Sequence, residues 1–180
     1  MKDLGGLGGH RTQANGINRA GKIVGSSETA SGVAHAVSWK DGVISDLGTH
    51  GHRDGGATAV NNPGQIAGFL GNAPDEFSKD EGFPFIFLAG TWTVLSTRQI
   101  FSSATAINNG GVMVGYDAEL DDPDANEDAW VRAANGTLSY LPELTAKGND
   151  QARGINKYGT IVGLSTSKAG WPVAALWRAP

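Results

Sequence analysis

The side chains best suited to chemistry gather in the irregular segments between short apolar runs. Nine of them combine hydrogen-bond donors, acceptors and one stacking ring, and they form the candidate ligand-binding set: His10, Arg11, His52, Arg53, Asp54, Arg98, Asn149, Asp150 and Trp171. Mixed arginine, histidine, asparagine and aspartate groups suit hydrogen bonding to a sugar or a small anion. We expect Trp171, beside Pro172, to offer an exposed stacking platform.

The sequence assigns no residue to catalysis. It contains no Gly-x-Ser-x-Gly elbow, no Gly-x-x-x-x-Gly-Lys-Ser/Thr loop and no His-Glu-x-x-His motif. Asp54 and Asp150 would be the carboxylate pair of a glycoside-cleaving enzyme, but that mechanism demands a separation that the sequence does not fix. We therefore favour a protein without enzymatic activity.

Candidate metal ligands are few. His10 corresponds to His52 in the repeat described below, which places the two in different units and outside one coordination shell. Asp122, Asp124 and Asn126 begin like a calcium loop, although its turn glycine and closing glutamate are missing. These three residues are the candidate calcium ligands, and no other cofactor is expected. The absence of cysteine excludes disulfides and thiolate metal sites.

The candidate residues lie between four copies of one repeating unit. Each copy reads Ala-x-small-aliphatic-Asn, two further residues, and Gly-x-aliphatic-small-Gly, and the asparagines recur at intervals of 43 to 48 residues. The copies begin at Ala14, Ala57, Ala104 and Ala152. Glycine makes up 27 of the 180 residues, about twice the usual share, and two glycines per copy explain part of this excess.

A second apolar piece, a turn and a third piece follow the first three copies, and the fourth ends before its third piece. The second pieces span 34–39, 84–88, 129–132 and 173–177, and the third pieces span 43–47, 91–95 and 137–141. Alternating apolar residues with many β-branched side chains favour strands. Asn-x-x-Gly is typical of a four-residue turn, and Asp-Gly or Asn-Gly marks a hairpin. Each unit is therefore predicted to be a four-stranded meander, as in a β-propeller blade.

We predict an all-β protein with one domain over residues 1–180, a β-propeller with four blades of four-stranded antiparallel sheet. The repeats span approximately 3–45, 46–96, 97–140 and 141–180. Residues 2–5 resemble the fourth strand of the first unit, so the N-terminal strand is expected to close the last blade and to protect both sheet edges. A half-ring that dimerises into eight blades and an open repeat array are the alternatives.

The first unit resembles the HAF repeat, a bacterial repeat described as extracellular. The matching stretches are Asp3-Leu4-Gly5, Gly16-Ile17-Asn18, Ile23-Val24-Gly25 and His35-Ala36-Val37-Ser38-Trp39. The other units keep the asparagine and glycine positions and lose the His-Ala pair. The resemblance implies a secreted or cell-surface bacterial protein with a propeller-like fold. It implies no settled enzymatic activity, and no catalytic residues are carried over from it.

Charge and hydropathy narrow the classes of partner. With 14 Lys and Arg against 18 Asp and Glu, the formal net charge is −4, which argues against a nucleic-acid binder. No apolar run approaches the roughly 18 residues of a membrane span, and the first nine residues lack the apolar stretch of a signal peptide. The expected partners are a carbohydrate or protein ligand, with the chain a monomer or a homodimer.

In a propeller, one face carries two kinds of connection: those between strands 2 and 3, and those between strand 4 and the next blade. In this chain these connections differ most among the units. We therefore expect a non-enzymatic extracellular scaffold that presents a carbohydrate or protein ligand on that face. One alternative is a polysaccharide lyase or hydrolase with its site at the channel mouth. Another is a purely structural repeat, or a propeller half that oligomerises.

Overall fold

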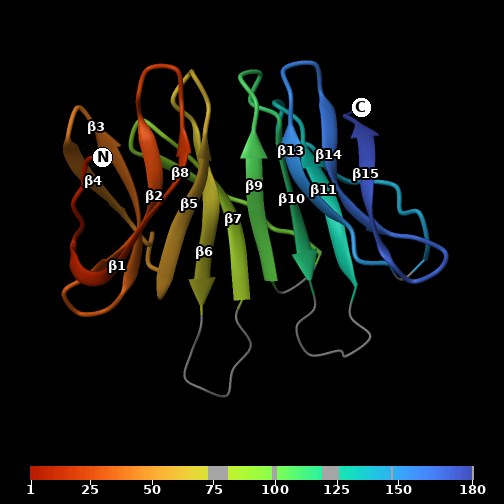
Figure 1. The fold of residues 1–180 in the computed structure, drawn as a ribbon, viewed down its shortest axis with the longest axis horizontal. Coiled ribbons are helices and arrows are strands. Elements are labelled where there is room, and N and C mark those ends of the chain that lie inside the picture. Colours follow the sequence, from red (N-terminus) through yellow and green to blue (C-terminus); the bar gives the residue numbers. More distant parts are fainter. Residues whose placement is uncertain (73–80, 99–100, 119–125, 147, 180) are drawn as a thin grey trace.

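The computed structural model describes residues 1–72, 81–98, 101–118, 126–146 and 148–179, and across these ranges the chain forms strands and no helix. The described residues accordingly contain no helix of the length and hydropathy needed to cross a membrane. The strands form four separate antiparallel sheets, called blades 1 to 4 in chain order (Figure 1). The predicted all-β class and the order of strands within each unit are confirmed.

Three blades have four strands and the last has three. Blade 1 contains β1 (Gly8–Ile17), β2 (Ile23–Thr29), β3 (Ala34–Lys40) and β4 (Val43–Gly48). Blade 2 contains β5 (Asp54–Val60), β6 (Ile66–Asn72), β7 (Glu81–Leu88) and β8 (Thr91–Val94). Blade 3 contains β9 (Phe101–Ile107), β10 (Met113–Ala118), β11 (Glu127–Arg132) and β12 (Leu138–Tyr140). Blade 4 contains β13 (Gln151–Ile155), β14 (Thr160–Thr166) and β15 (Pro172–Arg178).

The repeated asparagine builds the turn between the first two strands of each blade. In blade 3 the Oδ1 atom of Asn108 accepts hydrogen bonds from the backbone N–H groups of Gly110 (2.9 Å) and Val112 (3.0 Å). Gly111 closes the turn with a φ of 79°, a value that glycine adopts without strain. The hairpin between β3 and β4 has positive φ at both Asp41 and Gly42, as its twist requires. Both predicted turns are confirmed.

The last glycine of each repeat faces a β-bulge in the first strand of its blade. In blade 1 the register of β1 against β2 shifts between Ala14 and Gly16, next to Gly25. A Cβ atom at the repeat-ending glycine would lie 1.8–2.1 Å from a backbone carbonyl oxygen of the neighbouring strand at all four sites: Gly25, Gly68, Gly115 and Gly163. Glycine is required there because the bulge brings two backbones too close for a side chain.

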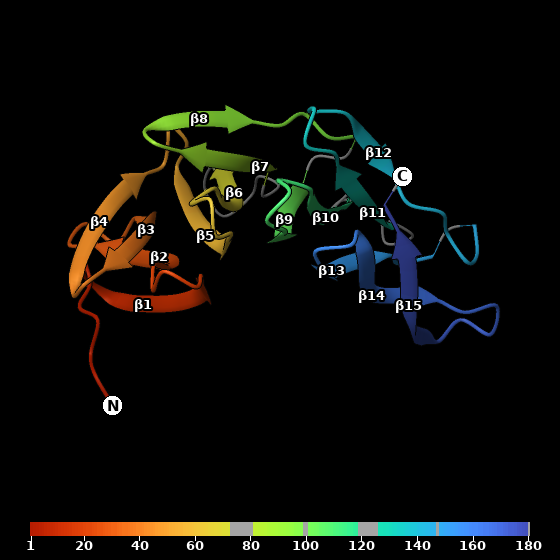
Figure 2. The same cartoon turned by 90° about the horizontal axis from the view of Figure 1, so that it is seen from above.

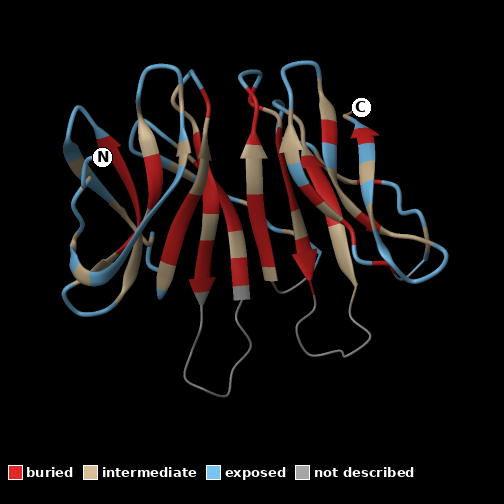
Figure 3. Cartoon of the chain, in the orientation of Figure 1, coloured by how far each residue is buried: buried red, intermediate tan, exposed pale blue. Residues whose placement is uncertain are grey.

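The hydrophobic core consists of three clusters, each between two successive blades. Val24 of blade 1 packs with Ile66 and Phe85 of blade 2, Ala67 of blade 2 packs with Met113 of blade 3, and Val114 of blade 3 packs with Ile161 of blade 4. Buried residues accordingly concentrate along the middle of the strands, while the turns are exposed (Figure 3). Blades 2 and 3 thus bury one side against the blade before them and the other side against the blade after them.

Hydrogen bonds join the blades in the same order. The amide Nδ2 of Asn18 donates to the carbonyl oxygen of Asn61 (3.0 Å), that of Asn61 to Asn108 (2.9 Å), and that of Asn108 to Asn156 (3.1 Å). Every bond runs from one blade to the next along the chain. We call this series the asparagine ladder.

The four blades form an arc that is open on one side (Figure 2). Their substantial strand-to-strand packing is confined to single blades and to successive blades. The predicted closure by the N-terminal strand is not confirmed: among the described residues no fourth strand lies beside β15, and residues 1–6 form no strand. These residues stay on blade 1, where Trp39 Nε1 donates to the carbonyl oxygen of Gly5 (3.1 Å).

Candidate ligand-binding face

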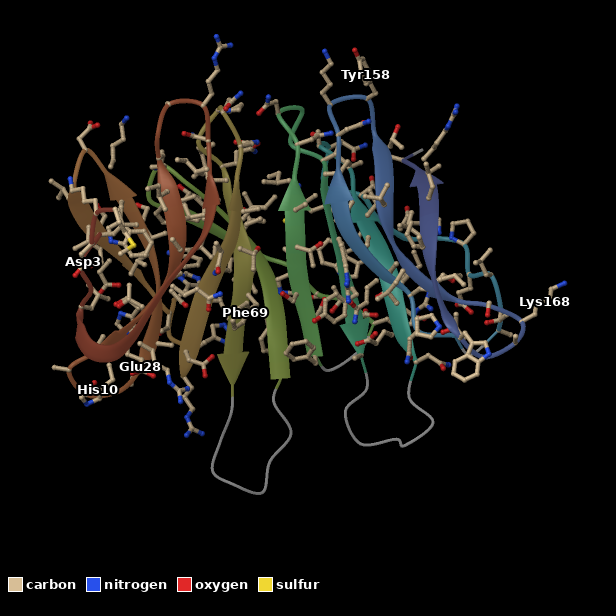
Figure 4. The ribbon with its side chains drawn as sticks, viewed as in Figure 1. Asp3, His10, Glu28, Phe69, Tyr158 and Lys168 are labelled. Atoms are coloured by element: carbon tan, nitrogen blue, oxygen red, sulfur yellow. The ribbon has the colours of Figure 1, made fainter. Side chains whose placement is uncertain are left out.

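One edge of the arc carries the variable connections. Because the strands of a blade are antiparallel, β2 and β4 end at the same edge, as do their equivalents in the other blades. We call this edge the loop face and the opposite one the turn face. His10, Glu28 and Lys168 lie at the loop face, and Tyr158 projects from the turn face (Figure 4).

A hollow of about 600 Å³ lies on the loop face of blade 1. Its polar lining residues come from β1 and β2: His10, Arg11, Thr12, Gln13, Ser26 and Glu28. Two of these, His10 and Arg11, belong to the predicted ligand-binding set. They were expected in a loop, but they lie in β1, which begins at Gly8. The strand extends this far because Gly8 pairs with Thr29 through an irregular stretch of the ladder.

Glu28 organises this hollow. Its Oε2 atom accepts hydrogen bonds from the backbone N–H groups of His10 (3.2 Å) and Arg11 (3.1 Å), which lie in the irregular stretch of the register between Gly8 and Thr12. The guanidinium of Arg11 lies 3.9 Å from Glu28 Oε1 and is otherwise exposed. The carboxylate therefore holds the backbone in place while the side chains of His10 and Arg11 remain available to a ligand.

A second polar group lies on blade 3, around Asp117. The buried Oδ2 atom of Asp117 accepts hydrogen bonds from the Tyr140 hydroxyl (2.5 Å) and from the backbone N–H of Arg98 (3.1 Å). The Arg98 guanidinium covers the Tyr140 ring at 3.8 Å and reaches Asp128 at 3.4 Å. Burial, followed by the hydrogen bond to Asp117, raises the pKa of Tyr140. Arg98 is thus engaged with its own blade.

Asn149 and Asp150 tie blade 4 to blade 3. Asn149 Oδ1 accepts a hydrogen bond from the Glu127 backbone (3.2 Å), and the Asp150 backbone donates to the Glu127 carbonyl (2.7 Å). The Asp150 carboxyl is buried, and neither oxygen has a well-formed hydrogen bond in the described part of the chain. Burial raises its pKa, as does the nearby charge of Asp128, while Ser165 acts in the opposite direction. Asn149 is exposed, whereas Asp150 is buried where blade 4 meets blade 3.

The other predicted residues are spread over separate blades. The His52 ring packs against Phe83 with centroids 5.1 Å apart, Arg53 is exposed, and Asp54 is the first residue of β5 rather than a loop residue. Trp171 is exposed in the turn between β14 and β15, as expected of a stacking platform. Its backbone carbonyl accepts a hydrogen bond from Ser167 (2.9 Å), which fixes the turn.

No catalytic cluster forms among the described residues. His10, His52 and Asp150 belong to blades 1, 2 and 4, and no hydrogen bond or ion pair joins them in that part of the chain. The described ranges also contain no group of three His, Cys, Asp or Glu side chains able to hold a metal ion. Of the candidate calcium ligands, Asp122 and Asp124 lie outside the described residues, and Asn126 immediately precedes β11.

Sequence reasoning missed Glu28, Tyr140 and Asp117. Glu28 follows two serines within a predicted strand and loop, and only the bulged register of β1 turns its carboxylate toward two backbone N–H groups. Asp117 lies one residue before the end of β10, and its burial depends on how far that strand extends. A single carboxylate next to a strand terminus was the available signal in both cases.

Comparison with solved structures identifies the class of fold. The crystal structure of TolB from Acinetobacter baumannii, a β-propeller, is similar to this chain with a TM-score of 0.57 and 10% sequence identity, covering 91% of this chain and 39% of that one. No family model and no curated protein matched the sequence. The chain is thus an all-β, β-propeller-like protein that spans about two fifths of the length of that neighbour.

Proposed function

We propose that this chain is a non-enzymatic binding scaffold whose loop face takes a carbohydrate, with the hollow on blade 1 as the binding site. The observation that carries the proposal is the lining of that hollow by polar residues on two paired strands. Strands hold such groups at fixed spacing, so a ligand pays little entropy to order them.

The chemistry of the lining favours a sugar. The lining residues include the donors Arg11 and Gln13, the hydroxyl of Ser26 and the acceptor Glu28. A sugar ring presents adjacent hydroxyl groups that both donate and accept hydrogen bonds, so a lining of mixed donors and acceptors matches it. The proposal follows the predicted binding role and the extracellular location that the HAF resemblance implies.

A glycan array followed by titration calorimetry tests this function. We expect at least one glycan to bind, and Arg11→Ala to weaken its affinity about tenfold or more, because one lost hydrogen bond to a charged group is worth about 1.5–3 kcal/mol. Arg19→Ala is the matched control, since Arg19 lies next to the asparagine turn on the turn face.

Two results would contradict the proposal. One is an array without a binding glycan, in which case a protein ligand becomes the reading to test by the same pair of variants. The other is a glycan whose affinity falls equally in Arg11→Ala and Arg19→Ala, because the site would then not be the hollow on blade 1.

A further inference from the structure

The two ends of the arc expose surfaces that every internal blade buries. On the side of each blade that faces the next one, a residue of the second strand pairs with a residue of the third: Val24 with Ser38, Ala67 with Ile86, Val114 with Val131, and Val162 with Leu176. The first three pairs are buried. In blade 4 Val162 is 50% exposed and Leu176 is 64% exposed, because no blade follows.

The opposite end of the arc, at blade 1, also exposes an apolar residue that is buried in the internal blades. Ile107 and Met113 pair on the side of blade 3 that packs against blade 2, and both are buried. The equivalent pair in blade 1 is Ile17 and Ile23, and Ile17 is 67% exposed. One end of the arc therefore lacks a following blade and the other lacks a preceding blade.

The asparagine ladder ends in a hydrogen-bond donor on blade 4 and in an acceptor on blade 1. Asn156 keeps its Oδ1 bonds within blade 4, but its Nδ2 has no partner in the described part of the chain. The carbonyl oxygen of Asn18 accepts no bond from a preceding blade, whereas that of Asn61 does. A second ladder runs in parallel, from Asn15 and its equivalents Thr58 and Thr105 to the next blade's alanine carbonyl. In blade 4 its donor position is held by Arg153, whose guanidinium donates to Gln151 within the same blade.

The N-terminal residues occupy the place that follows a fourth strand. Trp39 of blade 1 donates to the carbonyl of Gly5, just as Trp177 of blade 4 donates to the carbonyl of Pro142 (2.8 Å). Pro142 follows Leu141, which extends β12 by donating its backbone N–H to Ala129 (2.8 Å). Because Gly5 is equivalent to Pro142, Leu4 is equivalent to Leu141. The residues before Leu4 are then equivalent to the fourth strand of a preceding blade.

The register of this strand follows from the complete blades. Gly115 pairs with Trp130, which pairs with Tyr140, and Gly68 pairs with Phe85, which pairs with Val94. Gly163 in blade 4 pairs with Ala175. The residue one before Leu4 therefore belongs opposite Ala175, which sets Asp3 against Ala175 on the open edge of β15.

We propose that a second copy of this chain docks head to tail on the first, so that residues 2–4 of each copy form the missing fourth strand of the other's blade 4. Leu176 and Val162 then pack against Ile17 and Ile23 of the other copy, and Asn156 donates to the other copy's Asn18 carbonyl. The two interfaces are identical and close a two-fold symmetric ring of eight blades. This assembly is independent of the proposed carbohydrate site.

Cysteine cross-linking between separate copies tests the register, since the natural chain has no cysteine. Asp3→Cys in one preparation is mixed with Ala175→Cys in another and oxidised. Directly opposite residues in an antiparallel pair are close enough for a disulfide. We expect a covalent species of twice the chain mass. Lys2→Cys mixed with Ala175→Cys is the control, because adjacent strand residues point to opposite sides of the sheet.

Each outcome of the cross-linking experiment either supports or overturns the proposal. A cross-link with Asp3→Cys and not with Lys2→Cys supports the proposal. Equal yields, or no cross-link, overturn it. A disulfide that forms only within single chains of a variant carrying both Asp3→Cys and Ala175→Cys also overturns it, because one chain would then close on itself.

A substitution on the exposed end gives a second test without disturbing the folded chain. Leu176→Asp places a charge where the other copy would pack, and we expect light scattering to report one chain where the wild type reports two. Val43→Asp is the matched control: Val43 is 65% exposed, and its pairing with Lys40 puts it on the other side of the sheet from Trp39. A Leu176→Asp chain that retains the wild-type mass contradicts the proposal.

Discussion

Asn61 makes hydrogen bonds both within its own blade and to the next one. Its Oδ1 accepts from the backbone N–H of Gln65 (2.8 Å), which shapes the turn, and its Nδ2 donates to the Asn108 carbonyl (2.9 Å), which joins two blades. Aspartate would keep the first bond and lose the second. The repeat therefore requires an amide at this position, and a turn-forming propensity alone does not explain the choice.

Asp150 is a buried carboxyl whose protonation bears on stability. Because burial raises its pKa, the folded protein binds a proton more readily than the unfolded chain does. The wild type therefore loses stability as pH rises from the ordinary aspartate range through the raised pKa. We predict that Asp150→Asn is more stable than the wild type at neutral pH, and that this advantage shrinks as pH falls through that window.

Urea denaturation between pH 3.5 and 7 measures this difference. Asp41→Asn, at the exposed turn between β3 and β4, controls for the loss of one negative charge from the chain. A constant difference between Asp150→Asn and the wild type across this range would show that the buried carboxyl does not titrate as described.

Among the elements, the bulged first strands depend on the repeat-ending glycines. A Cβ atom at Gly115 would lie 2.1 Å from the Ser103 carbonyl oxygen and 2.3 Å from the Trp130 ring. Gly115→Ala should lower the free energy of unfolding by about 3 kcal/mol, because two strands would have to separate within a packed blade. Gly154→Ala is the control, where the nearest atom is Val162 Cγ2 at 3.5 Å, and it should change stability by less than about 1 kcal/mol.

Denaturant unfolding of the two variants measures the free energy of unfolding that each substitution removes. Equal stabilities of Gly115→Ala and Gly154→Ala would contradict the close backbone approach at the bulge.

The repeat pattern was enough to predict the strands and turns, because local signals determine them. The asparagine turns and the Asp41-Gly42 hairpin lie where predicted. The start of β1 at Gly8 was not predictable, since it depends on a bulged pairing with Thr29 and on Glu28 bonding two backbone groups. The burial of Asp150 was not predictable for a similar reason: it is set by packing between blades that the repeat does not encode. Asn149 stays exposed, and its role in ligand binding remains a prediction.

At the scale of the whole molecule, the curvature of the arc decides whether the chain closes. Curvature arises from how Val24, Ala67 and Val114 pack on the following blades, and four similar sequence units do not reveal how far each blade turns. The similarity of residues 2–5 to a fourth strand predicted closure within one chain, and in the described part of the chain these residues pair with no strand of the last blade.

The arc carries its loop face along one edge, and its two ends complement one another. The ends expose apolar residues, a ladder donor and an unpaired strand edge, and exposed strand edges favour pairing with another chain. The carbohydrate site on blade 1 and the paired ends use different surfaces, so they are open to separate tests.

Sedimentation equilibrium of the unmodified chain is the most direct test of this account. For a chain of 18.6 kDa, we predict a single species of twice that mass, constant over a wide range of protein concentration. A mass of 18.6 kDa at every concentration would contradict the ring of two copies. A mass that grows continuously with concentration would contradict it as well, because head-to-tail contacts that do not close produce filaments.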